Sequence, residues 1–233
     1  MPLSTPQSAL PCVVPPEDRD AHMQAVRGRL AEGTGALEAR ARAFESRSSE
    51  QNRMRLTRQA LNSETVPKKL LWLRREADLV ATAAAGLSPC QAGCSHCCNI
   101  GTLVAEPEAI VIGKAIGRPL ADVPAQRATR ALDAMQGGDA MKQAEAVRNM
   151  VHSEFYGVPC TFLVEGRCSI YEHRPMSCRY LVNFDSDALL CRLVPGETIE
   201  ARYLNMRKQQ AAYLAAMGLN ARIADIRDWF PKG

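Results

Sequence analysis

The crowding of cysteines is the feature that most constrains this chain. Four of its nine cysteines lie within nine residues, in the run PCQAGCSHCCNI, as Cys90, Cys94, Cys97 and Cys98. Packing alone does not account for four crowded thiols, and thiolates are the soft ligands that hold Zn²⁺ and iron–sulfur clusters. The two-residue gap from Cys94 to Cys97 lets both sulfurs point at one ion, and Gly93 permits the tight turn that this requires. The run therefore predicts a metal site.

A second set of cysteines begins about sixty residues later, with Cys160, Cys168 and Cys178, and Cys191 lies a little beyond. The gaps within this set are too wide for a second knuckle of the kind that a zinc ribbon needs. The remaining ligands must therefore come from separate elements. We expect the two stretches to meet around a metal, because structural zinc binding contributes on the order of 10–16 kcal/mol, enough to offset the closure of the intervening loop.

The number of thiols leaves the kind of metal centre open. Seven or eight sulfurs exceed the needs of one tetrahedral zinc ion. They suit a four-cysteine cluster with spare thiols, or two metal centres. Adjacent Cys97 and Cys98 are expected to point different ways in an extended backbone, so that one binds metal and the other packs, or each serves a different metal. We favour an iron–sulfur cluster over Zn²⁺, because there is one knuckle and a surplus of sulfur.

The composition predicts a mainly α fold. Of the 233 residues, 46% are hydrophobic and 23% charged, as in ordinary globular proteins, and only 5% are aromatic. We expect a helical N-terminal region plus an irregular Cys-rich metal-binding module with a small β-hairpin. The regions are a disordered tail at 1–16, a helical region at 17–85, the Cys-rich module at 86–195, and C-terminal helices at 196–233 that pack on the module. Cys12 lies in the tail and is expected to be an incidental exposed thiol.

Several local patterns predict individual elements. A helix starts at Pro67 and ends at Gly86, with one apolar stripe formed by Leu70, Leu73, Ala77, Val80, Ala81 and Ala84. The segment 35–62 is either two helices or one partly solvated helix. Pro107 opens a short helix through Ala115, and residues 123–153 hold two helices. Residues 161–171 form a hairpin with Glu165-Gly166-Arg167 as the connection. The last long helix runs from Thr198 to Met217, with Tyr203 and Met206 facing inward and Gly218 as its cap. Ile223, Ile226, Trp229 and Phe230 then pack back on the core.

The cysteine pattern resembles the YkgJ-type CxxCxxCC family, whose members are described as zinc- or iron-chelating proteins. The matching positions are Cys90, Cys94, Cys97, Cys98, Cys160, Phe162, Leu163, Gly166, Arg167, Cys168, Ile170, Tyr171, Arg174, Pro175, Cys178 and Arg179. The resemblance covers residues 88–182 and leaves Cys191 outside. It implies a cysteine-rich metal site with no general assigned reaction. A flagellin lysine methylase is similar over the cysteine motif, which connects the pattern with methyl transfer.

The predicted metal ligands are drawn from Cys90, Cys94, Cys97, Cys98, Cys160, Cys168 and Cys178. Arg174 and Arg179 flank Cys178 and are predicted to bind the cofactor, because four thiolates around Zn²⁺ or a cluster leave about two net negative charges that guanidinium groups offset. The alternative for these arginines is an ordinary ion pair with Glu172 or Asp185. Other side chains near the cysteines are potential ligands, and His173 is expected to be a solvated turn histidine. His96 is expected to point away from the metal, and Glu108 to sit at the N-terminus of its own helix.

Several function classes fit these observations. We expect a cytoplasmic protein that binds a metal ion or cluster, since no secretory signal and no membrane-spanning stretch is visible. A net charge of +4 does not predict nucleic-acid binding, whereas a protein partner could use the N-terminal helices. The alternatives are a cluster-dependent enzyme, acting in redox chemistry or in methyl transfer linked to S-adenosylmethionine, and a disulfide-linked or thiol-catalytic protein.

Overall fold

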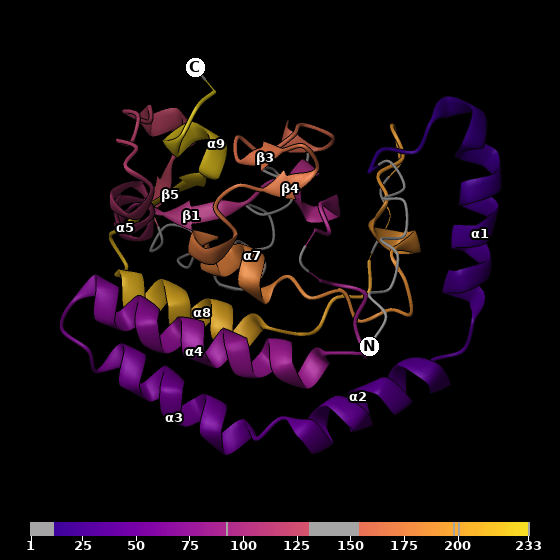
Figure 1. The fold of residues 1–233 in the computed structure, drawn as a ribbon, viewed down its shortest axis with the longest axis horizontal. Coiled ribbons are helices and arrows are strands. Elements are labelled where there is room, and N and C mark those ends of the chain that lie inside the picture. The colour runs from indigo at the N-terminus through magenta and orange to yellow at the C-terminus, as the bar shows by residue number, and fades with distance from the viewer. Residues whose placement is uncertain (1–11, 92, 131–153, 198, 200, 233) are drawn as a thin grey trace, which may run out of the picture.

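The computed structural model describes residues 12–91, 93–130, 154–197, 199 and 201–232, and these parts are mainly α-helical, as predicted (Figure 1). The described α-helices are α1 (Arg19–Ala31), α2 (Gly35–Arg47), α3 (Glu50–Leu61), α4 (Val66–Ala84), α5 (Glu106–Ile116), α7 (Met176–Tyr180), α8 (Arg207–Met217) and α9 (Ile226–Trp229). Short 3-10 turns are η1 (Pro16–Asp18), η2 (His96–Asn99), η3 (Ala125–Arg127), η4 (Tyr171–His173) and η5 (Leu189–Cys191). The strands are β1 (Leu103–Ala105), β2 (Thr129–Arg130), β3 (Leu163–Val164), β4 (Arg167–Cys168) and β5 (Arg222–Asp225).

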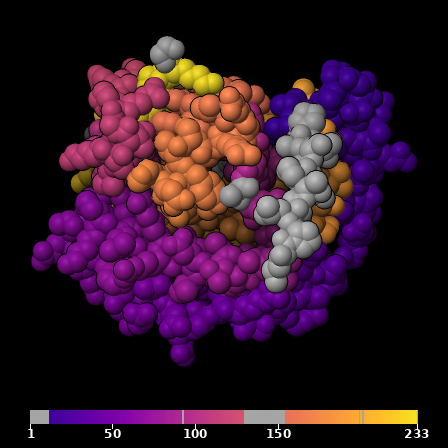
Figure 2. All heavy atoms as spheres, viewed as in Figure 1, coloured from indigo at the N-terminus to yellow at the C-terminus, as the bar shows by residue number. Residues whose placement is uncertain are grey.

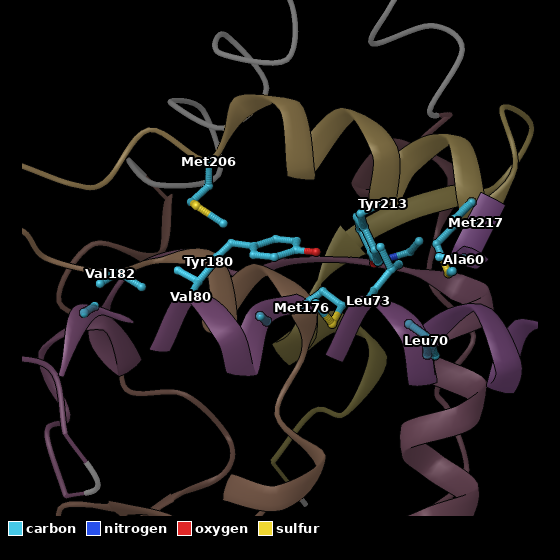
Figure 3. Packing of buried hydrophobic residues seen from close by; sticks show 14 of the residues in the cluster. Ala60, Leu70, Leu73, Val80, Met176, Tyr180, Val182, Met206, Tyr213 and Met217 are labelled. Carbon is cyan, nitrogen blue, oxygen red and sulfur yellow. The ribbon is translucent and has the colours of Figure 1, made fainter. Parts of the chain in front are cut away.

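Helix α4 is the central element of the larger core. Proline at its first turn and an apolar stripe produce it, as predicted, although Ala81 is exposed and Ala83 takes its place in the core. The stripe packs against α3, α7 and α8. The close-up in Figure 3 shows Leu70, Leu73 and Val80 in one layer with side chains from these neighbours. The short helix α7, which carries Cys178, packs into this core through Met176 and Tyr180.

The segment 35–62 forms two helices. Ser49 starts α3 by accepting a hydrogen bond from the Asn52 amide at 3.3 Å, and the backbone of Ser48 is extended, so α2 and α3 are separate. Arg40 and Arg47 of α2 donate to the carbonyl oxygens of Leu87 and Ala85, at 3.2 and 3.0 Å. These bonds tie the N-terminal helices to the segment that leads into the first cysteines.

The three-stranded sheet was not predicted. Its order is β1–β5–β2, with antiparallel pairing of Val104 with Ala224 and of Thr129 with Ile223. Strands of two to four residues are too short to show an alternating pattern, and their partners lie about a hundred residues away in the chain. The sheet matters for the site because Thr102 and Asp225, at its end, lie beside the first cysteine run.

Two predicted helices differ from the structure. The last long helix begins at Arg207 and not at Thr198, because residues 202–204 form backbone hydrogen bonds with Val182 and Phe184, at 2.9 and 2.7 Å. Tyr203 is consequently 39% exposed, whereas Met206 is buried and Gly218 caps the helix as expected. Two helices were predicted in 123–153. The described part, up to residue 130, forms only the turn η3 and the strand β2, because Thr129 and Arg130 pair with β5, and residues 131–153 lie outside the described residues.

A second, smaller core carries the predicted hairpin. Strands β3 and β4 pair Leu163 with Cys168, and the turn residues Glu165 and Gly166 have φ of 49° and 73°, the positive values that a tight two-residue turn requires. The hairpin prediction is therefore confirmed. Buried residues from β1, from α5 and the segment after it, from the flanks of the hairpin and from the end of the chain form this core, and Cys160 and Cys168 pack against it: Val104, Ala109, Ile112, Val123, Phe162, Ile170, Ala224, Ile226, Trp229 and Phe230.

The N-terminal arm, residues 12–31, runs along one edge of the molecule (Figures 1 and 2). Val13 forms a parallel bridge with Leu193, and Val14 is 2% exposed. The expected tail thus differs from the structure at 12–16, because an apolar Val-Val pair packs there despite the surrounding prolines. In the described part of the chain, no helix has both the length and the apolar character needed to cross a bilayer.

Candidate metal centre

The two cysteine stretches meet directly. The Cys160 amide donates to the Cys98 carbonyl at 2.7 Å, and the Gly157 amide donates to the Asn99 carbonyl at 2.8 Å. Residues 157–160 therefore run alongside residues 98–99, although about sixty residues separate them in sequence. This juxtaposition is the one that the spacing of the cysteines predicted.

A buried ion pair from the C-terminal segment fixes this junction. The Arg227 guanidinium donates from one nitrogen to the carbonyl oxygens of Cys98, Ile100 and Val158, at 3.1, 3.1 and 2.7 Å. Its other terminal nitrogen bonds Asp225 at 2.9 Å, and Asp225 also accepts from the Thr102 amide at 2.5 Å. The five-donor fork of arginine suits such a set of acceptors, and lysine could not satisfy it.

The first of two sets of thiols, here called the deep thiol group, comprises Cys97, Cys98, Cys160, Cys168 and Cys178. A hydrogen bond with the Cys98 side chain, together with burial, holds the pKa of Cys97 well above its usual range. Burial and the neighbouring charges of Cys97 and Cys160 do the same for Cys178. The prediction that Cys97 and Cys98 point apart differs from this arrangement, because both lie in the 3-10 turn η2, where backbone is not extended.

Arg174 lies beside this group, and Arg179 does not. The Arg174 charge lowers the pKa of Cys97, Cys168 and Cys178 against the effect of burial, and its guanidinium stacks on Tyr171 at 4.3 Å. Arg179 instead donates to the Glu172 carbonyl at 2.8 Å and to Asp78 at 3.4 Å. Of the two predicted cofactor-binding arginines, the first lies where it can stabilise thiolates, and the second supports the loop before Cys178.

The carboxylate of Glu108 accepts a hydrogen bond from the first residue of the short helix α7. Glu108 is fully buried and accepts from the Met176 amide at 3.0 Å and from the Tyr213 hydroxyl at 2.7 Å. We expected Glu108 to stabilise the start of its own helix. It caps α7 instead, because its carboxylate satisfies a free amide in the first turn of that helix. The side chain of Ser177 also donates to the Leu103 carbonyl, so α7 is anchored to β1.

The second set of thiols, here called the outer thiol group, comprises Cys12, Cys90, Cys94 and Cys191. The Cys12 thiol donates to the His96 carbonyl at 3.4 Å, and the Asn183 amide donates to Cys90 Sγ at 3.2 Å. Burial raises the pKa of Cys191 to about 12, and the charges of Cys90 and Cys94 add to the rise. The predicted ligand set left out Cys12 and Cys191, which the structure places near the first cysteine run.

Thiols are the donors that a soft metal prefers. Among the described residues, however, no three or more Cys, His, Asp or Glu side chains are placed so that together they could hold a metal ion. Burial keeps most of these thiols protonated, with pKa values above the usual one. Metal binding thus requires loss of protons and rotation of side chains, which occurs in picoseconds to nanoseconds for unhindered groups.

Comparison with known proteins gave one match. Residues 89–192 match the family model CxxCxxCC, described as "Putative zinc- or iron-chelating domain". The match includes eight of the nine cysteines, among them Cys191, and leaves Cys12 outside. Searches of curated proteins and of solved structures found none. The description of the family supports metal binding and assigns no reaction.

Proposed function

Since residues 89–192 form a CxxCxxCC domain, we propose that this protein binds an iron–sulfur cluster through four thiolates of the deep thiol group. The contact between Cys160 and Cys98 carries the proposal, because it brings the two cysteine stretches to one place. Four thiolates hold a [2Fe–2S] or a [4Fe–4S] cluster. Such a cluster, when bound, supplies one-electron transfer.

The surroundings of the deep thiol group support a negatively charged cofactor. Arg174 adds a positive charge beside Cys97, Cys168 and Cys178, which favours their thiolate forms. The backbone around Cys98 and Cys160 is pinned by Arg227, so these ligands are presented without a cost for ordering their loops. We also propose a cytoplasmic location, because thiolate ligands have to stay reduced before the metal binds.

Anaerobic purification followed by iron, sulfide and zinc analysis tests the proposal. We expect brown protein with stoichiometric iron and acid-labile sulfide. Cys178→Ser and Cys168→Ser should lose most of the iron and the visible absorbance, whereas Arg167→Ser, a change beside Cys168 on an exposed site, should keep both. Colourless protein with zinc in the deep thiol group would overturn the cluster, and protein that takes up neither metal would overturn metal binding as well.

A further inference from the structure

We propose that α3 and the first half of α4 form a docking surface for a segment of a partner protein that carries both acidic and apolar side chains. This surface, here called the basic face, consists of Arg55, Arg58, Leu61, Lys68, Leu71 and Arg75. It lies outside the CxxCxxCC domain, so the inference goes beyond the proposed function and does not depend on which metal the thiols bind.

Positive charge is concentrated in this part of the chain. Residues 50–75 hold seven lysines and arginines against two glutamates, a net charge of +5, whereas the whole chain carries +4, so that the remainder carries −1. Four of the seven cations are exposed, namely Arg55, Arg58, Lys68 and Arg75. Within the described part of the chain, none of these four side chains forms an ion pair with a carboxylate. Their charges are therefore available to an acidic partner.

The surface beside α3 is hollowed in two places, and Arg58 lines both hollows. The larger hollow, of about 480 Å³, lies at the junction of α3 and α4, which run side by side in Figure 1. Its lining includes Arg55, Lys68 and the ring of Trp72. The smaller hollow, of about 280 Å³, lies between α3 and α8, and Leu61 lines it. Two adjoining hollows of this kind can receive neighbouring side chains of one peptide segment.

Apolar side chains lie between the cations. Leu61 and Leu71 are each 44% exposed. On α4, Leu71 follows Lys68 by three residues and precedes Arg75 by four, so these three side chains share one face of the helix. On α3, Leu61 follows Arg58 by three residues in the same way. A partner that matches this alternation offers apolar side chains to the leucines and carboxylates to the cations.

The same residues favour a protein segment over a nucleic acid. Single-stranded nucleic acids are bound by basic grooves in which bases stack on aromatic rings. Trp72 is the one aromatic residue in 50–75, and its ring is half-buried and covered by the Arg75 guanidinium at 4.6 Å. The exposed leucines give nothing to a phosphate. The basic face thus offers cations and aliphatic contacts but no free stacking surface.

Intrinsic fluorescence of the full chain tests the proposal. The chain has two tryptophans, and Trp229 is 1% exposed, so a ligand at the basic face changes the emission of Trp72. The probe is a synthetic amphipathic helical peptide of glutamate and leucine, as long as α3. We expect a saturable change in emission, retained in Trp229→Phe and weakened at high salt. A matched peptide with lysine in place of glutamate should cause none.

Arg55→Ser combined with Arg58→Ser tests the basic face directly. We expect its affinity for the glutamate peptide to fall at least tenfold, with unchanged helical circular dichroism and unchanged metal content. Arg27→Ser combined with Arg167→Ser removes the same charge from two exposed sites elsewhere, and it should bind the peptide like wild type.

Three results would overturn the docking surface while leaving the metal proposal intact. The first is that wild type does not bind the glutamate peptide, and the second is that both double variants bind it equally well. The third is that single-stranded DNA or vesicles containing phosphatidylserine bind more tightly than the peptide, with an affinity that falls in Arg55→Ser combined with Arg58→Ser. In that case the basic face would serve a nucleic acid or a membrane surface.

Discussion

The deep and outer thiol groups differ in what holds the chain around them. The deep group is surrounded by buried interactions from three segments: the Arg227–Asp225 pair, the Glu108 cap on α7 and the apolar hairpin core. The outer group depends on a short backbone pair, on the exposed ion pair of Arg19 with Glu197, and on one more protected pair, that of Arg29 with Asp185. Buried polar groups are expensive to disturb, whereas surface ion pairs contribute little. We therefore expect a rigid deep site and an outer site that opens readily.

The largest expected effect comes from Arg227→Met. This change leaves the Asp225 carboxylate buried without its cation and frees three carbonyl oxygens, and breaking a buried pair costs about 3–5 kcal/mol. Denaturant unfolding should show this loss, and the iron content should fall. Asp225→Asn combined with Arg227→Met should recover part of the stability. A loss below about 1 kcal/mol would show that the Arg227–Asp225 ion pair does not stabilise the deep group.

The second largest expected effect is a pH dependence of the free energy of unfolding, caused by Glu76 in the core that α7 packs into. Glu76 of α4 is fully buried beside Tyr180. Burial raises its pKa to about 7, against the opposing effects of the Arg53 charge and of hydrogen bonding with Tyr180. Because the folded state keeps this proton longer than the unfolded chain, the free energy of unfolding should fall as pH rises from about 4.5 to 7, by about 3 kcal/mol.

Glu76→Gln isolates this effect, because glutamine does not titrate. Subtracting the unfolding free energy of Glu76→Gln from that of wild type at each pH removes the contribution of all other groups. The difference should decline through this window and level off above pH 7. A difference that did not change with pH would place the pKa of Glu76 near its ordinary value. The packing of α4 against α7 would then contribute no pH dependence to the stability.

The smallest effect is expected at the outer group. Arg19→Met removes the exposed ion pair with Glu197 and the hydrogen bond to the Pro195 carbonyl, and we expect a loss of at most about 1 kcal/mol, reduced at high salt. Alkylation of Cys12 should become several times faster while Cys178 is unaffected. Arg27→Met, an exposed change on the same helix, is the control. Equal acceleration at Cys12 and Cys178 would contradict the difference between the two groups.

Patterns among neighbouring residues were sufficient to predict those elements whose formation depends mainly on residues close in sequence. The proline start and apolar stripe of α4, and the Glu165-Gly166 turn of the hairpin, depend on residues close in sequence. The crowding of the first cysteine run is also a local signal, and it led to the prediction that residues 90–98 would lie against residues 160–178. These signals were visible because each is repeated over several neighbouring positions.

Long-range partners were not predictable in this way. Nothing near Glu108 in sequence indicates Met176 or Tyr213, and nothing near Arg227 indicates the carbonyl of Cys98. Cys12 is the clearest case, since its proline-rich surroundings suggested a tail, and its contacts depend on Leu193. In each case tertiary pairing, without any periodic pattern, decides the role of the residue.

The position of Arg227 has a consequence for biosynthesis. All nine cysteines leave the ribosome before Arg227, so the nascent chain presents its thiols while the two cysteine stretches are still unpinned. Under the proposed function, the deep group becomes complete only after translation of the last described helix, α9. A chain that stalls before that helix would lack the hydrogen bonds by which Arg227 joins the two cysteine stretches.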